Sequence, residues 1–183
     1  SADDRKNTLR LEYDESIPDK LEGDSVKLSQ IFINLIGNSL KFTQNGDVVV
    51  RVSKSKEQDK KVTLRFEIED NGVGISKKKQ KSIFESFSQA SLQINRKFGG
   101  TGLGLSIVKN LLELMGSRIQ LESQLGKGSK FWFDIVFEVS TNELTGVTGE
   151  TVLNEESPFS PVSPYALSKL TCYQVCKYYR RVY

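Results

Sequence analysis

The sequence has 183 residues, of which 37% are hydrophobic and 27% charged, and its formal net charge is +3. This is the composition of an ordinary globular protein, the small charge gives no argument for nucleic acid binding, and no apolar run is long enough to cross a membrane. The sequence contains no histidine, which excludes triads, metal sites and phosphohistidine that would use a histidine of these residues.

The first expected elements are a strand and a long helix. Residues 8–13 alternate polar and apolar side chains, as a half-buried strand does. Asp24 is a suitable N-cap, and the apolar period after it predicts a helix from residue 25 to about residue 42.

Three polar residues fall within about 60° of one another along this helix, at the rim of its apolar face: Asn34, Asn38 and Lys41. Two amides and an amine in this arrangement could meet a metal ion and phosphates. They could equally be a polar edge that faces water, and the helix taken alone favours this second interpretation.

A turn at residues 45–47 leads to two expected strands, residues 48–52 and 62–68, around a polar loop at residues 54–61. The second strand runs into Asp70, which two glycines, Gly72 and Gly74, follow. A carboxylate here can accept a hydrogen bond from a base while the glycine backbone closes around it. The alternative is a simple turn that the Asp70 side chain closes.

Residues 99–104 contain four glycines and precede a helix expected over residues 105–115. The N-terminus of that helix would favour an anion held by the glycine-rich loop, although a hinge before a buried helix would have the same sequence. Before it, lysine-rich residues 77–81 read as the solvated face of a short helix, and residues 88–98 as a loop typical of a lid.

Gly116 is expected to cap the helix, and two further strands, residues 118–123 and 129–137, are joined by a hairpin at residues 126–128. Helices and strands mix without a strict βαβ repeat. We therefore expect an α/β fold, a two-layer sandwich of one mixed sheet with helices on one face, followed by a C-terminal helical tail.

Five segments of residues 1–139 resemble, in the same order, the sequence boxes of sensor histidine kinases. They are residues 34–43 (N box), 70–75 (G1 box), 83–90 (F box), 99–105 (G2 box) and 126–129 (last glycine box). One glycine box is weak by itself, whereas the ordered set is specific. The resemblance implies the ATP-binding catalytic domain, with the Bergerat fold, that histidine kinases share with type II topoisomerases and heat-shock chaperones (the GHKL superfamily).

The resemblance also implies ATP and Mg²⁺ as cofactors and a role for each matching residue. Asn38 would be the Mg²⁺ ligand, Lys41 would contact phosphate, and Asn34 would support the metal or its water. Asp70 would accept a hydrogen bond from the exocyclic amine of adenine, beside the backbone of Gly72 and Gly74. Gly100, Gly102 and Gly104 would shape a lid over the triphosphate, with Thr101 and Leu103 beside them. Arg96 or Lys97 would supply positive charge to the γ-phosphate.

Asn34 bears on the type of reaction. ATP-hydrolysing relatives have a glutamate at this position to activate water, and an amide cannot serve as that general base. The resemblance thus implies transfer of the γ-phosphoryl group to a histidine on a separate dimerisation domain, with a response-regulator receiver domain downstream and a cytoplasmic location. The alternative is a catalytically silent nucleotide-binding or assembly module.

Residues 140–183 differ in composition from residues 1–139, because they hold both cysteines, three of the four prolines and five of the six tyrosines. They resemble a segment of an extended short-chain dehydrogenase of the GDP-mannose 4,6-dehydratase type. The catalytic residues that the resemblance implies are Thr141, Glu143, Tyr165 and Lys169. Because residues 1–139 are no NADP-binding half, we expect a fusion, natural or engineered, without dehydratase activity. A helix expected at residues 165–181 either docks on the first unit or pairs with a second copy in a homodimer.

Overall fold

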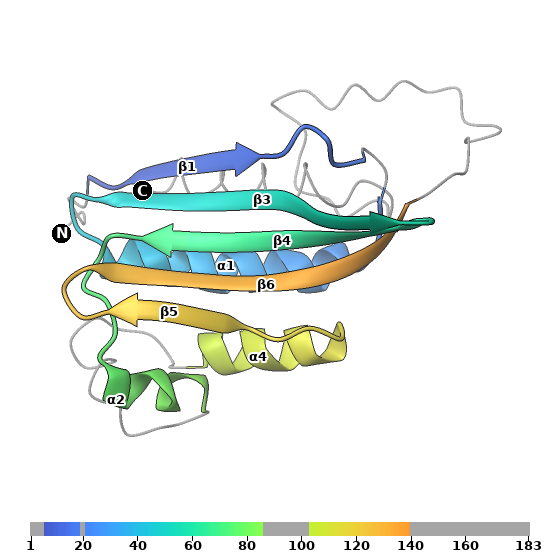
Figure 1. The fold of residues 1–183 in the computed structure, drawn as a ribbon. Helices are drawn as coiled ribbons and strands as arrows, with labels where there is room; N and C mark the ends of the chain where they lie inside the picture. Colours follow the sequence, from blue (N-terminus) through green and yellow to red (C-terminus); the bar gives the residue numbers. More distant parts are fainter. Residues whose placement is uncertain (1–5, 19–20, 86–102, 140–183) are drawn as a thin grey trace.

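The computed structural model describes residues 6–18, 21–85 and 103–139, which form one mixed six-stranded sheet with helices packed against it (Figure 1). The strands are β1 (Thr8–Tyr13), β2 (Leu21–Glu22), β3 (Asp47–Gln58), β4 (Lys61–Asp70), β5 (Gln120–Gln124) and β6 (Gly128–Val139). The helical elements are α1 (Ser25–Phe42), α2 (Lys77–Gln80), the 3₁₀ turn η1 (Ser82–Phe84) and α4 (Gly104–Leu114).

The sheet has the strand order β1-β3-β4-β6-β2, and β5 pairs with β6 beside this path. β1 and β3 are parallel, whereas the other pairs are antiparallel. The register sets Asp70, at the end of β4, opposite Ser129 at the start of β6. The predicted two-layer α/β arrangement with a mixed sheet is therefore confirmed.

The core lies between the sheet and α1, which crosses behind the central strands in the view of Figure 1. Alternate residues of β4 and β6 point into it, and the ring of Phe32 on α1 meets the ring of Phe66 at 5.5 Å between centroids. Phe66 in turn stacks on Phe133 at 5.2 Å. α4 packs beside α1 and buries Val108 and Leu112 completely. Contact of this kind makes the sheet and both helices one rigid unit.

The ends of the two long helices follow from local sequence. Asp24 caps α1, since its Oδ1 accepts a hydrogen bond from the Lys27 N–H at 2.9 Å. Gly116 follows α4 with φ of +71°, and the Ser117 N–H donates to the carbonyl of Leu112 at 2.8 Å. Both caps were predicted. α4 starts at Gly104, one residue before the expected helix, and ends at Leu114 rather than at residue 115.

The predicted polar loop at residues 54–61 was wrong. β3 continues to Gln58 and pairs with β4 as far as Lys61, with a register shift between Lys54 and Lys56, so the turn has only two residues, 59 and 60. Asp59 adopts φ of +57°, which Asp tolerates better than most residues. The hairpin extends beyond the core, and its polar side chains face water on both sides. The two-residue strand β2 was not predicted, because two residues carry no period.

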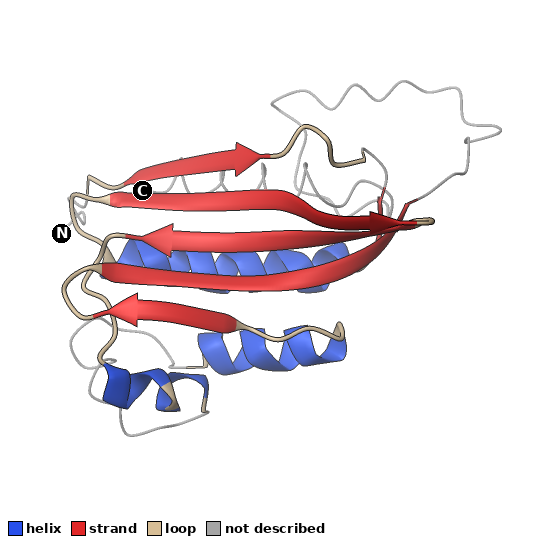
Figure 2. Ribbon diagram, viewed as in Figure 1, coloured by secondary structure: helices blue, strands red, loops and turns tan. Residues whose placement is uncertain are grey.

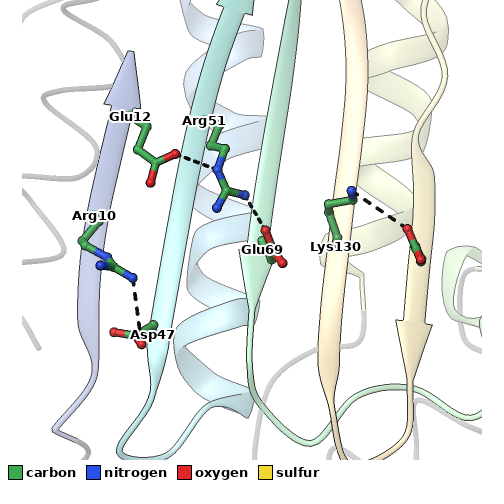
Figure 3. Close-up of polar contacts among 7 residues, drawn as sticks. Arg10, Glu12, Asp47, Arg51, Glu69 and Lys130 are labelled. Atoms are coloured by element: carbon green, nitrogen blue, oxygen red, sulfur yellow. Dashed lines mark hydrogen bonds and ion pairs between the residues drawn. The ribbon is translucent and has the colours of Figure 1, made fainter. Parts of the chain in front are cut away.

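The sheet face away from α1 carries ion pairs between neighbouring strands, with the helices on the other side (Figure 2). Arg51 on β3 contacts Glu12 on β1 at 2.7 Å and also Glu69 on β4, and Arg10 lies 4.0 Å from Asp47 (Figure 3). Such half-exposed pairs each contribute little to stability.

Within the described ranges, no helix combines the length and the hydrophobicity that a bilayer crossing requires. The expectations for residues 140–183, including Thr141, Glu143, Tyr165, Lys169 and the helix-mediated dimer, lie outside the described residues.

Candidate functional site

Asp70 ends β4 and is nearly enclosed, with 7% of its surface exposed. Its Oδ1 accepts a hydrogen bond from the Gly72 N–H at 3.0 Å, and its Oδ2 accepts one from the Ser39 hydroxyl on α1 at 3.1 Å. The bond to Gly72 is the turn that the sequence offered as an alternative. That bond uses one of the four lone-pair sites of the carboxylate, so the turn and a ligand contact are compatible.

The enclosure of Asp70 determines its electrostatics. Loss of hydration raises the pKa of this carboxyl above the ordinary value of 3.8, and the neighbouring Glu69 carboxylate adds to the rise. The hydrogen bonds from Gly72, Ser39 and the Ser129 backbone oppose it. These three donors use three of the four lone-pair sites of the carboxylate, so one acceptor position remains for a ligand.

Ser39 and Thr43 are buried polar residues of this region that the sequence did not single out. Ser39 is 2% exposed and follows Asn38 on α1, while Thr43, the residue after α1, is 1% exposed. The Thr43 Oγ1 has no hydrogen-bond partner in the described part of the chain. The only sequence signal was, for Ser39, a hydroxyl at a position of α1 that the helical period turns towards the core.

The glycines after Asp70 are required by close packing. A Cβ on Gly72 would lie 2.4 Å from the carbonyl oxygen of Phe42, at the end of α1, and 2.8 Å from Thr43 Oγ1. Gly74 has φ of +65°, and a Cβ there would lie 2.0 Å from the carbonyl oxygen of Gln124. The backbone after Asp70 is thus pressed between α1 and the β5–β6 hairpin.

A second cluster lies where α4 begins. A Cβ on Gly104 would lie 2.8 Å from Asn34 Oδ1 and 3.7 Å from Asn38 Nδ2. The first residue of α4 therefore packs on both amides. The Asn34 amide also donates to the Gln30 carbonyl at 2.8 Å. Asn34, which is half-buried, consequently lies against the start of another helix.

Within the described residues, no side chain caps the N-terminus of α4. Leu103 occupies the N-cap position, and its side chain cannot accept a hydrogen bond from the helix. The Leu103 carbonyl accepts from the Ile107 N–H and the Ser106 hydroxyl. The N–H groups of the first turn therefore favour an anion.

The remaining sequence-predicted residues divide into two groups. Lys41 is half-buried near the end of α1, with its Nζ 5.2 Å from the ring centroid of Phe42. Arg96, Lys97, Gly100, Thr101 and Gly102 lie outside the described residues. The expected lid is therefore represented here only by Leu103 and Gly104.

The chemistry of the two clusters is complementary. Along the second half of α1, a buried carboxylate that Ser39 contacts offers an acceptor, and the amides of Asn34 and Asn38 lie beside the first residue of α4. Among the described residues there is no group of three or more acidic, histidine or cysteine side chains that could hold a metal. An amide oxygen such as that of Asn38 is a hard oxygen donor, the kind of ligand that Mg²⁺ prefers.

Comparison with known proteins supplies the family. The family model described as histidine kinase-, DNA gyrase B-, and HSP90-like ATPase matches residues 23–139. Signal transduction histidine-protein kinase BarA of Escherichia coli K12 is 40% identical over 142 residues, which are 78% of this chain and 16% of that protein. Sensor histidine kinase AruS of Pseudomonas aeruginosa is 41% identical over 146 residues, 79% of this chain and 14% of that protein. The chain thus spans less than a fifth of the length of these relatives.

Solved structures agree with this result. Full-length ShkA in complex with AMPPNP has a TM-score of 0.61 at 30% identity, over 74% of this chain and 27% of that one. The catalytic domain of histidine kinase ThkA has a TM-score of 0.55 at 27% identity, over 70% of this chain and 78% of that one.

A second family model, the NAD dependent epimerase/dehydratase family, matches residues 104–183. This match agrees with the predicted resemblance of the C-terminal part to a dehydrogenase. It also overlaps the first match over α4, β5 and β6, which in this structure belong to the α/β sandwich. The first family model covers more than half of the sequence, and the chain belongs to the histidine kinase-, DNA gyrase B-, and HSP90-like ATPase family.

Proposed function

We propose that residues 1–139 bind ATP with Mg²⁺ and transfer its γ-phosphoryl group to a histidine of a partner dimerisation domain. The observation that supports this most is that two clusters meet on the second half of α1. Asp70 and Gly72 contact its last residues, and Gly104 packs on its amides Asn34 and Asn38. The family membership and the relatedness to histidine kinases point to the same function.

The adenine base would lie against Asp70, whose carboxylate would accept a hydrogen bond from the exocyclic amine. Gly72 and Gly74 would let the backbone come close to the ring. The phosphates would extend along α1 towards the N-terminus of α4, where the N–H groups of its first turn and Lys41 would meet their charge. Residues 96–104 would close over them.

Asn38 would hold Mg²⁺ through its amide oxygen, with Asn34 supporting the metal or its water. Mg²⁺ would neutralise phosphate charge and orient the γ-phosphoryl group. The protein would then act mainly by positioning the nucleotide and excluding water, because no general base is needed to activate water when an imidazole is the nucleophile. Asn34 fits this assignment, since an amide cannot deprotonate water.

The acceptor histidine would belong to a dimerisation domain outside these 183 residues, which contain no histidine. In the transfer, the bond from the γ-phosphorus to the bridging oxygen would break, ADP would leave, and a phosphorus–nitrogen bond to the imidazole would form. The phosphohistidine would then supply a receiver domain. We also propose that the catalytic unit ends near residue 139, where β6 ends and the family match stops.

The test is phosphotransfer to a supplied acceptor. The full chain would be mixed with γ-labelled ATP, Mg²⁺ and the isolated dimerisation domain of a related histidine kinase, and acid-labile label on that domain would be measured. We expect labelling that depends on the chain and on Mg²⁺ and disappears when the acceptor histidine is replaced. ADP binding without any labelling would instead favour the catalytically silent nucleotide-binding module.

A further inference from the structure

The backbone after Asp70 is held by hydrogen bonds to two other elements. We call residues 72–75 the G1 segment. The Val73 N–H donates to the Phe42 carbonyl at the end of α1 at 3.2 Å, and the Val73 carbonyl accepts from the Gly126 N–H of the β5–β6 turn at 2.7 Å. The first half of the G1 segment therefore bridges α1 and the β5–β6 hairpin.

The second half is held by Ser123 on β5. Its Oγ accepts a hydrogen bond from the Ile75 N–H at 2.8 Å and donates to the Gly128 carbonyl at 2.9 Å. The Ser129 Oγ lies 2.9 Å away and can donate to the remaining lone pair. One hydroxyl thus uses its single hydrogen and both lone pairs, and links the G1 segment to both strands of the hairpin.

Gln80, at the end of α2, makes the complementary contact. Its Nε2 donates to the Ile75 carbonyl at 2.9 Å and to the Ser123 carbonyl at 2.8 Å, which uses both amide hydrogens. Both backbone groups of Ile75 are therefore bonded, one to Ser123 and one to Gln80. The backbone of Gly74 lies so close to Gln124 that a Cβ would meet its carbonyl oxygen at 2.0 Å.

We infer that Ser123 and Gln80 are positioning residues for the base of the bound nucleotide, acting through the backbone of the G1 segment. This inference rests on the proposed function, in which that backbone lies against adenine. Their contacts are to the backbone of Ile75 and of the hairpin, so they set where the segment lies relative to Asp70. The cluster of Asn38 and Gly104 is not part of this network.

This arrangement predicts a particular pattern of effects. Loss of either side chain lets the G1 segment move and weakens contact with the base, while the phosphate side stays intact. The affinity for nucleotide should therefore fall by a factor that is the same with and without Mg²⁺. The KM for ATP should rise by a similar factor, and kcat should stay close to that of the wild-type chain.

The experiment compares Ser123→Ala and Gln80→Ala with Ser123→Thr, which keeps the hydroxyl, in the full chain. The matched control is Ser117→Ala, because the Ser117 hydroxyl donates to the Asp134 carbonyl at 2.5 Å, a part-buried bond away from the G1 segment. ADP affinity is measured by calorimetry with and without Mg²⁺. We expect about five- to tenfold weaker binding for both alanine variants of the network, as loss of one or two hydrogen bonds implies, and near wild-type binding for Ser123→Thr and Ser117→Ala.

Amide hydrogen exchange supplies a second readout, since the Ile75 N–H should exchange faster in Ser123→Ala than in the wild type. If Ser123→Ala fails to fold, Gln80→Ala, which changes a short surface helix, decides the outcome. The positioning role would be overturned, with the proposed function intact, if the folded Ser123→Ala and Gln80→Ala variants bind ADP as tightly as the wild type. A loss of ADP affinity in Ser117→Ala as large as in those variants would have the same meaning. A wild-type chain that binds no ADP would overturn the proposed function together with it.

Discussion

Replacing Asp70 with asparagine tests the proposed base contact with almost no change in shape. The carboxylate has two acceptor oxygens, of which Oδ1 serves the Gly72 N–H and Oδ2 serves the Ser39 hydroxyl. The amide that replaces the carboxylate has one oxygen and one NH₂ group. The fixed Gly72 N–H requires the oxygen, so the NH₂ group must turn towards Ser39, whose hydroxyl can rotate to accept. An adenine amine that approaches on the Ser39 side, at the Oδ2 position, would then meet a donor, and its hydrogen bond would be lost.

The magnitude follows from the type of bond. A hydrogen bond to a charged group contributes about 1.5–3 kcal/mol, which corresponds to an increase in Kd of about tenfold to 150-fold. We expect the upper part of this range, because Asp70 is only 7% exposed and water cannot readily replace it. Folding should be preserved, since the substitution also removes the cost of burying the charge.

The assay is a calorimetric titration of the wild type and of Asp70→Asn with ADP, after a thermal melt has shown that both are folded. The control is Asp134→Asn, which removes a carboxylate from β6 that pairs with Arg65 at 2.8 Å on the opposite face of the sheet. That variant should bind ADP as the wild type does. Unchanged ADP affinity in folded Asp70→Asn would refute the assignment of Asp70 to the base.

Three further predictions concern pH, metal and packing. The raised pKa of Asp70 means that protonation stabilises the folded state below pH 3.8, and this contribution is lost as pH rises through the folded-state pKa. Binding of ADP, in contrast, needs the carboxylate. In parallel titrations, lowering the pH from neutral towards 3.8 should therefore weaken ADP binding more steeply for the wild type than for Asp70→Asn. Asn38→Ala should abolish the gain in ADP affinity that Mg²⁺ gives, about tenfold or more, and leave the metal-free affinity unchanged; an intact Mg²⁺ effect would contradict the ligand assignment. Gly74→Ala should lower the free energy of unfolding, measured by urea denaturation, by about 2–5 kcal/mol, because strain from positive φ adds to a backbone clash. The control Gly116→Ala, at φ of +71° with open space around it, should cost only about 1–2 kcal/mol of strain. Equal losses in the two variants would show that the clash at Gly74 is relieved.

Local signals were sufficient for most of the fold. The alternation over β1 and the apolar period of α1 predicted both elements with their observed ends, because each buries one face and caps or turns mark where it stops. The β3–β4 hairpin was predicted too short. Its outer residues on β3 carry polar side chains on both faces of the strand, which leaves no alternation to detect.

The site was predicted in part for the same reason. Asp70 and Gly72 were identified from their place after a strand, and Asn38 from its place on a helix and from the family resemblance. The contact between Asn34 and Gly104 joins residues far apart in the sequence, so no local pattern could reveal it.

Ser39, Ser123 and Gln80 were missed because serine and glutamine are ordinary surface residues in any sequence. Ser39 matters because of the carboxylate that it meets across the core. Ser123 and Gln80 matter because two backbone groups of Ile75 need partners where β5 passes the end of α2. Such requirements arise only from tertiary packing.

The most direct test of the account is an NMR titration of the ¹⁵N-labelled chain with ADP and Mg²⁺, followed residue by residue. We predict saturable shifts that are largest at the amides of Asn38, Gly72 and Gly104, with the ion-paired outer face of the sheet, at Arg51, unchanged. Saturable shifts confined to other residues, or no saturable shifts at all, would contradict the claim that these segments form one nucleotide site.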